Sequence, residues 1–379
     1  MPDRRPVLVY RETLVAASEP FILAQGEGLE RHVAWYLALR RAAGHPLPAE
    51  RSLVWRADGG ALGSARRGAW KRWGLAPRTM RAVRALHPAV VHAHFGRDAA
   101  QVLPMVDRAG APLVVTFHGH DVFRTDESLR TGSRSDRLYL ERRARLAATG
   151  ARFLAVSTVV RDRLLELGFP SDRVELHHIG VDVDRIERSA AGVDRDPKLV
   201  VFAGRLVPHK GASDLVRALA DARLTGVRLA IVGDGPGRRE VDALGRALDV
   251  RIEHLGFLEQ DQVWAWMARA ATVVVPSRTA ESGWVEAFGL VAAEAQAAGT
   301  PVIASRCGGL GEAVAPACRS MMFDEGDVEQ LAERLAATFD DPAASDQRGA
   351  ESRVWVRQHL ALAIQNRRLD DLYEEVSPP

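Results

Sequence analysis

Two cations lie close together in the second half of the sequence, in a segment typical of an anion site. The stretch GRLVPHKG (204–211) precedes a helical pattern and contains Arg205 and Lys210. Gly204 permits a tight turn, while the free amides and the dipole of a helix start favour a bound anion. The chain has three lysines against 48 arginines, so a lysine here indicates a need for a compact ammonium. We therefore predict a phosphate site, in preference to a surface lysine without a ligand.

Two glutamates lie eight positions apart in the stretch EAFGLVAAEAQAAGTPVIAS (286–305). If the whole stretch were helical, Glu286 and Glu294 would lie about 12 Å apart along the axis and within about 80° of one face. This spacing suits two carboxylates that hold hydroxyls on separate parts of one extended ligand, and it is too long for an acid–base pair acting on one bond. Gly289, near the expected helix start, would let a ligand approach the free amides.

Histidines gather at the ends of two apolar runs in the first half of the chain. They are His92 and His94 in VVHAHF (90–95), and His118 and His120, followed by Asp121, in TFHGHD (116–121). Imidazoles and a carboxylate at short spacing are typical ligands of a divalent metal ion. From residue types and spacing alone, a metal site and a hydrogen-bonding role both stay open.

Short apolar runs alternate with helical stretches along the chain, which is the pattern of parallel sheets covered on both faces. The expected strands are VLVY (7–10), VVHAHF (90–95), LVVTFHG (113–119), RFLAVS (152–157), VELHHI (174–179), LVVFAG (199–204), RLAIVG (228–233), TVVVPS (272–277) and PVIAS (301–305). We predict an α/β protein of two doubly wound Rossmann-like domains facing across a cleft, with ligands beyond the carboxyl ends of the strands.

The expected domain boundaries follow the change in composition near the middle of the chain. They are an N-terminal domain at 1–181, a charged linker at 182–197, a second domain at 198–355 and a helical segment at 356–379 that packs back on the first domain.

Composition limits the functional class and the compartment. The 379 residues are 47% hydrophobic and 26% charged with a net charge of +2, which is ordinary for a globular protein and gives no indication of nucleic acid. Cys307 and Cys318 form no recognisable disulfide or metal-binding pattern, which suits a reducing compartment. No apolar stretch approaches the roughly 20 residues of a membrane span, and the N-terminal one is too short for a signal peptide. We therefore expect a cytoplasmic protein.

Several motifs together resemble glycosyltransferase family 4, whose members are retaining enzymes of the GT-B fold that use nucleotide-sugar donors. Arg205 with Lys210, and the Glu-x7-Glu arrangement of Glu286 and Glu294, are similar to the donor-site motifs of that family. The resemblance covers most of the chain. It includes, in order, SEPFI (18–22), HAHFG (92–96) and the segments 156–186, 232–248, 254–270 and 275–289. The first two are similar to the bacterial exopolysaccharide branch.

The resemblance implies a role for each matching residue of a hexosyltransferase. The implied catalytic residues are His118, Arg205, Lys210 and Glu286. The implied donor-binding residues are Gly204, Leu258, Phe288, Gly289, Leu290 and Glu294, and the acceptor-side candidates are Ser18, Glu19, His94 and Asp121. Arg205 and Lys210 would bind the pyrophosphate, with Glu286 on the donor sugar. Glu294 would hold the ribose, and Leu258 lies in the base-contacting segment.

No metal or other cofactor is expected, because the resemblance places cations where a metal-dependent transferase uses a divalent ion. His118 matches a histidine beside the donor sugar, which favours hydrogen bonding over metal ligation. Roles for His92, His177 and His178 are not implied. The resemblance also implies retention of the anomeric configuration by front-face attack, in which an oxygen of the leaving group takes the acceptor proton.

A basic segment bears on the acceptor, which is expected to be a glycan, a lipid-linked compound or a small molecule. Between Arg51 and Arg84 there are nine basic residues and one acidic residue, with Trp55, Trp70 and Trp73 among them. This composition favours peripheral contact with an anionic membrane at the inner face of the plasma membrane. A basic acceptor pocket or a solvated helical face is an equal alternative.

Other functional classes stay open at this point. One is a sugar-nucleotide epimerase of related fold, and another is a nucleotide-sugar binder without catalytic activity. A metal-dependent His-x-His hydrolase on an eight-stranded barrel would use His92 and His94, but it leaves Lys210 and Glu294 unexplained.

Overall fold

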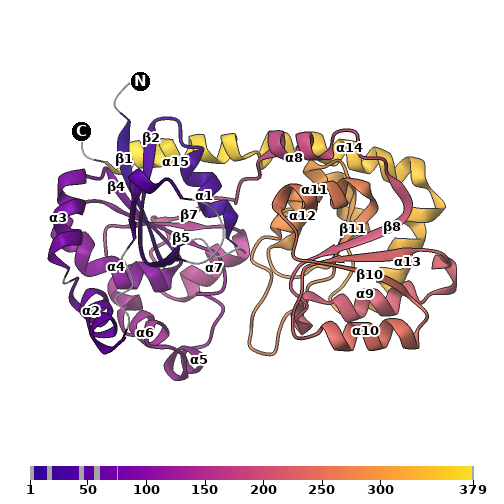
Figure 1. Cartoon of the computed structure of the whole chain (residues 1–379), viewed down its shortest axis with the longest axis horizontal. Coiled ribbons are helices and arrows are strands. Elements are labelled where there is room, and N and C mark those ends of the chain that lie inside the picture. The colour runs from indigo at the N-terminus through magenta and orange to yellow at the C-terminus, as the bar shows by residue number, and fades with distance from the viewer. Residues whose placement is uncertain (1–3, 15–18, 42–46, 55–59, 75, 378–379) are drawn as a thin grey trace. The chain divides into compact units, whose positions relative to one another are not determined.

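All nine apolar runs predicted as strands lie in parallel β-sheets in the computed structural model (Figure 1). The structure describes residues 4–14, 19–41, 47–54, 60–74 and 76–377. The chain divides into unit 1, Met1–Gly180 with Leu362–Pro379, and unit 2, Val181–Ala361. Each unit has its own helix-covered sheet, so the prediction of two Rossmann-like α/β domains is confirmed.

The described strands of unit 1 form a seven-stranded parallel sheet in the order β3-β2-β1-β4-β5-β6-β7. They are β1 (Arg5–Leu14), β2 (His32–Arg41), β3 (Ser52–Val54), β4 (Val90–His94), β5 (Leu113–Phe117), β6 (Arg152–Ala155) and β7 (Val174–Leu176). The helices are α1 (Pro20–Glu27), α2 (Gly60–Trp73), α3 (Pro77–Leu86), α4 (Gly96–Ala109), α5 (Asp126–Thr131), α6 (Arg134–Ala147), α7 (Thr158–Glu166) and α15 (Leu362–Val376), with a 3-10 turn at Ala49–Arg51. Both β4 and β5 are buried at every position, as strands covered on both faces must be.

The C-terminal helix α15 completes the core of unit 1. Leu369 and Tyr373 pack in one apolar cluster with residues of β1, β4 and β5. Between them, Asp370 lies 2.8 Å from His32 Nδ1 and accepts a 2.9 Å hydrogen bond from the Glu30 amide. These buried contacts make the last helix an integral part of unit 1.

The described strands of unit 2 form a five-stranded parallel sheet in the order β10-β9-β8-β11-β12. They are β8 (Asp196–Ala203), β9 (Arg228–Val232), β10 (Arg251–Gly256), β11 (Ala270–Val275) and β12 (Val302–Ala304). The helices are α8 (Val183–Ala190), α9 (Ala212–Leu219), α10 (Arg238–Ala247), α11 (Gln260–Arg269), α12 (Leu290–Ala297), α13 (Val328–Asp340) and α14 (Pro342–His359), and the 3-10 turns are Pro208–Lys210, Ala222–Leu224, Leu310–Glu312 and Pro316–Met321.

The predicted domain boundaries need two corrections. The segment 182–197 is no linker, because it contains α8 and the first residues of β8 and clusters with unit 2. Helix α8 buries Val183 and Ile186, which explains why this charged sequence forms a helix. At the other end, α14 runs across the predicted boundary at 355, and the chain enters unit 1 at Leu362.

Candidate functional site

The loops that carry the predicted phosphate site meet at the point where the strand order of unit 2 reverses. After β8 the chain adds β9 and β10 on one side of that strand, and later β11 and β12 on the other side. The loops after β8 and β11 therefore begin side by side at the carboxyl edge of the sheet. Ligands of doubly wound sheets bind at this kind of crevice.

Glycines let these two loops approach each other closely. Gly211, at the end of the first loop, has a φ of +71°, and a Cβ there would lie 1.9 Å from the Pro276 carbonyl oxygen that follows β11. A second close approach joins the loops after β8 and β9, where the Gly204 carbonyl oxygen would lie 2.2 Å from a Cβ on Gly233. Larger residues at 211 or 233 would force the backbone segments apart.

Lys210 and Glu286 join the two loops through an ion pair. The Lys210 Nζ donates to Glu286 Oε2 at 2.6 Å, and the Ser277 hydroxyl donates to the same oxygen at 3.0 Å. The side chain of Lys210 is 26% exposed and that of Glu286 is 14% exposed. The ammonium also lies 4.9 Å from the centroid of the Trp284 ring. The pair is thus held in place and still open to a ligand.

Arg205 supplies a second cation on the same loop. Its side chain is exposed, and within the described residues its guanidinium forms no ion pair. An ammonium with donors to spare and a guanidinium without an ion pair among the described residues thus lie on one loop, as the predicted anion site requires, and the bound anion itself stays a prediction.

Helix α12 begins later than a continuous helix from Glu286 would require. Its first residue is Leu290, and Gly289 before it has a φ of +90°. A Cβ on Gly289 would lie 2.1 Å from Leu310 Cδ1, so this position accepts only glycine without rearrangement. Glu286 therefore lies in the loop and not on the helix face, and Phe288 in the same loop is buried.

Glu294 lies within α12 and is 9% exposed. Burial raises the pKa of its carboxyl group to about 7. Gln260, the first residue of α11, donates to Glu294 Oε1 at 3.0 Å. The half-buried Leu258 lies just before α11, in the segment after β10. A buried carboxylate with one neutral donor is costly to ionise, which is typical of a functional position.

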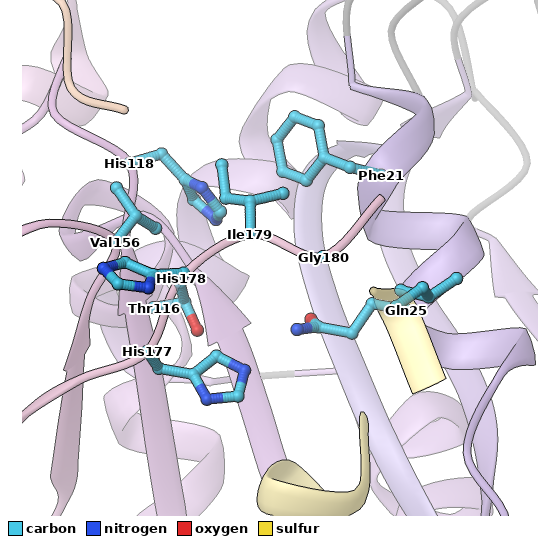
Figure 2. Close-up of a pocket in the computed structure, with 10 residues that line it drawn as sticks. Phe21, Gln25, Thr116, His118, Val156, His177, His178, Ile179 and Gly180 are labelled. Carbon is cyan, nitrogen blue, oxygen red and sulfur yellow. The ribbon is translucent and has the colours of Figure 1, made fainter. Parts of the chain in front are cut away.

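In unit 1 the histidines at the ends of β4 and β5 come together. His94 Nδ1 lies 3.1 Å from His118 Nε2, and the two rings stack with centroids 5.3 Å apart. Burial, together with neighbouring imidazoles and Arg11, lowers the pKa of both rings well below 6.5, so both are neutral near pH 7. His118 also lines a cavity of about 10 Å³, roughly the space of one water, together with His177 and His178 (Figure 2).

His92 belongs to the core of unit 1. Its Nδ1 lies 2.5 Å from the Tyr373 hydroxyl and its Nε2 lies 2.7 Å from Thr116 Oγ1. Both ring nitrogens are therefore engaged, and the two sheets are open, so the barrel hydrolase is wrong. No group of three or more His, Cys, Asp or Glu side chains in the described part of the chain is arranged to hold a metal ion. Metal independence itself stays a prediction.

The other acceptor-side candidates have structural contacts. Asp121 is buried, accepts a 2.5 Å hydrogen bond from the Gly96 amide at the start of α4, and has a pKa raised to about 6 by burial. Glu19 forms a two-pronged ion pair with Arg11. Ser18 lies outside the described residues.

Family models match almost the whole chain. The model described as Glycosyltransferase Family 4 matches residues 23–185, and the one described as Glycosyl transferases group 1 matches residues 183–355. A glycogen synthase of Mycobacterium tuberculosis is 30% identical over 287 residues, which cover 74% of this chain and 67% of the relative. A D-inositol 3-phosphate glycosyltransferase of Catenulispora acidiphila is 31% identical over 295 residues, covering 72% and 68%.

The chain belongs to glycosyltransferase family 4. It is a glycosyltransferase of the GT-B fold, as the motifs predict. In agreement, the structure of HepE from Anabaena in complex with UDP is similar with a TM-score of 0.76 and 20% identity, covering 98% of this chain and 100% of HepE.

One residue of this glycosyltransferase was missed by the sequence motifs. Arg11, near the end of β1, is 7% exposed and donates to Asp98 Oδ2 at 2.6 Å as well as to Glu19. Its guanidinium lies 4.2 Å from the centroid of the Phe95 ring. An arginine that directly follows the apolar run VLVY was the available signal, because arginine is rarely buried unless it is paired.

Of the two tryptophans that the structure describes in the basic segment 51–84, only one is exposed. Trp70 is fully buried, Trp73 is 55% exposed, and Trp55 lies outside the described residues. Lys71 pairs with Glu12. No described helix is both long enough and apolar enough to span a bilayer.

Proposed function

We propose that this glycosyltransferase moves a sugar from a nucleotide-diphosphate sugar to an acceptor hydroxyl, with retention of the anomeric configuration and without a catalytic metal. The proposal rests on the Lys210–Glu286 pair, which joins the two loops at the reversal point of the unit 2 sheet. An anion-binding group and a hydroxyl-binding group thus lie in direct contact, as a sugar joined to a diphosphate requires.

The cations of the first loop suit a diphosphate. The ammonium of Lys210 has three donors and spends one on Glu286, which leaves two for phosphate oxygens. Arg205 adds a planar fork for bidentate contacts. The amides at the start of α12, beside Gly289, contribute the positive end of a helix dipole.

The two glutamates suit hydroxyl groups. Glu286 accepts from Lys210 and Ser277 through Oε2, and within the described residues no hydrogen bond occupies its Oε1. That oxygen would accept from the donor sugar, while Glu294 would accept from the ribose. HepE, a protein of the same fold, has been crystallised with UDP and with UDP-glucose, which supports a nucleotide-sugar donor.

His118 would act as a neutral hydrogen-bonding group beside the transferred sugar. Its Nδ1 is buried and forms no hydrogen bond within the described residues, so it is free for a ligand hydroxyl. A protonated imidazole is disfavoured there because burial and Arg11 lower its pKa.

In the proposed reaction the acceptor hydroxyl enters on the side of the leaving diphosphate. Arg205, Lys210 and the α12 amides would stabilise the charge that builds up on the diphosphate. One of its oxygens would take the acceptor proton, so no protein base is needed. A route through two inversions would need a carboxylate nucleophile on the opposite face of the sugar, whereas the family resemblance places Glu286 on the sugar hydroxyls.

The anomeric configuration of the first-formed product tests this proposal. Its proton coupling constant is compared with that of the donor, and we expect the same configuration. An inverted product would refute the mechanism. The donor is found first by thermal-shift screening of common nucleotide sugars, since a ligand that binds the folded state stabilises it.

Chelation tests the metal-free part of the proposal. Activity should survive exhaustive chelation, and His118→Ala should be strongly defective at unchanged metal content. Loss of activity with chelator and recovery with a divalent ion would overturn it. Conversion of the donor in the absence of any acceptor would instead favour an epimerase.

The acceptor would be a glycan, a lipid-linked compound or a small molecule. Contact of residues 51–84 with the inner face of the plasma membrane is a further proposal. It predicts sedimentation with anionic vesicles but not with zwitterionic ones, weakening as salt concentration rises.

A further inference from the structure

Unit 1 contains a cavity of about 450 Å³ that is lined mainly by cations. This volume is within the range of small-ligand sites, about 300–1,000 Å³. The lining cations are Arg11, Arg40, Arg67, Lys71, Arg97 and Arg134. Glu12 is the one carboxylate among its lining residues in the described part of the chain.

The cavity lies at the reversal point of the unit 1 sheet. β1 has β2 on one side and β4 on the other. The lining residues Arg11 and Glu12 come from the end of β1, Arg40 from the end of β2, and Arg97 from the start of α4 after β4. This is the crevice where doubly wound sheets bind ligands, so the cavity has the position of a binding site.

Three of the six cations are neutralised within the protein. Arg11 pairs with Asp98 and Glu19. Lys71 donates to Glu12 Oε1 at 2.5 Å and to Ser135 Oγ at 2.9 Å. Although burial raises the pKa of Glu12, its contacts with Lys71 outweigh this and lower the pKa overall, so the carboxylate is ionised and used internally.

Arg97 is the third neutralised cation, since its guanidinium lies 3.1 Å from Asp136 Oδ1. The remaining cations, Arg40, Arg67 and Arg134, form no ion pair with any described residue. Arg67 donates only to Ser64 Oγ, at 3.0 Å. The cavity therefore carries positive charge that the described protein groups leave uncompensated.

The start of helix α6 adds to this potential. Ser133, Arg134 and Ser135, the cap and first turn of α6, line the cavity. In the capping box of α6 the Ser133 amide donates to Asp136 Oδ2 at 2.8 Å and the Asp136 amide donates to Ser133 Oγ at 3.2 Å, so the amides of Arg134 and Ser135 are the ones that this box leaves for a ligand. Together with the three guanidinium groups that form no ion pair within the described residues, these two amides suit a group with two negative charges and several acceptor oxygens, which is a phosphate rather than a carboxylate.

Helix α2 is held firmly enough to present its cations to the cavity. Trp70 is fully buried, and its indole nitrogen lies 3.4 Å from the Tyr10 hydroxyl. In the same last turn of α2, Arg142 donates to the backbone oxygen of Lys71 at 2.8 Å and to that of Arg72 at 2.7 Å. The basic residues of α2 are thus set by the fold, while Arg78 and Arg81 on α3 are exposed and line no part of this cavity.

We propose that this cavity binds a phosphate group carried by the acceptor. This inference rests on the proposed function, because only a transferase has an acceptor. A phosphate held in the cavity would fix that acceptor in unit 1. The phosphate belongs either to a soluble phosphorylated compound or to the headgroup of a lipid-linked one. Both sources share the same chemistry, and the experiment separates them.

Calorimetric titration with glycerol 3-phosphate tests the cavity directly. The full-length chain carries Arg205→Ala and Lys210→Ala, so that phosphate binding in unit 2 does not contribute. We expect saturable binding that becomes about tenfold weaker in Arg67→Gln and in Arg134→Gln, because each variant removes a charged hydrogen-bond donor. Arg81→Gln on α3 is the matched control and should bind normally. Absence of saturable binding, or equal binding by all variants, would overturn the proposal.

Gly68→Glu provides a second variant that removes no native contact. Gly68 lines the cavity on α2, and a Cβ there would meet no atom within 4 Å. The variant should fold normally by circular dichroism and abolish glycerol 3-phosphate binding, because its carboxylate repels the ligand. Normal binding by Gly68→Glu would count against the cavity as the binding site.

Sedimentation with phosphatidylglycerol vesicles identifies the source of the phosphate. Vesicle binding that is reduced in Arg67→Gln and Arg134→Gln but not in Arg81→Gln supports a lipid headgroup in the cavity. Binding of glycerol 3-phosphate without vesicle binding supports a soluble acceptor. These measurements need no sugar donor, so a chain that binds phosphate through Arg67 but transfers no sugar would refute the proposed function and leave the phosphate site itself standing.

Discussion

Replacing Glu294 by glutamine should stabilise the fold at alkaline pH while it weakens nucleotide binding. The carboxyl group is 9% exposed, and burial raises its pKa from 4.5 to about 7. At about 1.36 kcal/mol per pKa unit, the folded state favours the protonated form by about 3.4 kcal/mol more than the unfolded chain does. Glutamine has nearly the same shape and keeps an oxygen for the hydrogen bond from Gln260.

The sign of the pH dependence follows from the direction of the pKa change. Because the pKa is higher in the folded state, this stabilisation is fully present below pH 4.5 and is lost as the pH rises through 7. The glutamine variant has no such loss. Relative to the unmodified chain, Glu294→Gln should therefore gain about 2.5 kcal/mol of unfolding free energy between pH 5 and pH 8.

Urea unfolding of the full-length chain at pH 5 and pH 8 measures this difference. Glu333→Gln is the matched control, because Glu333 is an exposed carboxylate on α13 of the same unit. The gain of Glu294→Gln between the two pH values is measured relative to this control. If the unfolding free energies of Glu294→Gln and the unmodified chain differed by the same amount at both pH values, the raised pKa of Glu294 would be refuted. Calorimetry with a nucleoside diphosphate should show weaker binding by Glu294→Gln, and unchanged affinity would refute the ribose role.

Two further predictions concern unit 2 and helix α2. Lys210→Ala should lower kcat about a hundredfold to a thousandfold, because it removes a hydrogen-bond donor to the leaving group. Lys198→Ala, at an exposed lysine, is the control and should have normal kcat. Near-normal steady-state kinetics for Lys210→Ala would contradict its pyrophosphate role. Gly211→Ala should lower the thermal unfolding temperature, because its Cβ would lie 1.9 Å from the Pro276 oxygen. Gly68→Ala, in the interior of α2 where a Cβ meets no other atom, should instead raise the free energy of unfolding by up to about 1 kcal/mol. Similar unfolding temperatures for both variants would contradict the close approach of the loops.

Local sequence determined most of the strands and the positions of the unit 2 site residues. Mainly apolar runs such as LVVTF in β5 are buried along their whole length, so their composition alone indicates strands. Three strands were not predicted. β10 is only partly buried and carries charged residues, and the sequence HVAWYLALRR of β2 contains alanine and leucine, which favour helices. β3 is only three residues long. Tertiary pairing overrides such local preferences.

Contacts between residues far apart in the chain were decided only by the tertiary structure. Arg11 meets Asp98, 87 positions away, and His92 meets Tyr373, 281 positions away. No periodicity or spacing in the sequence encodes such pairs, because they depend on which strands become neighbours in the sheet. The same is true of the cationic cavity: the sequence shows many arginines, but only the folded strand order shows which of them lack a carboxylate.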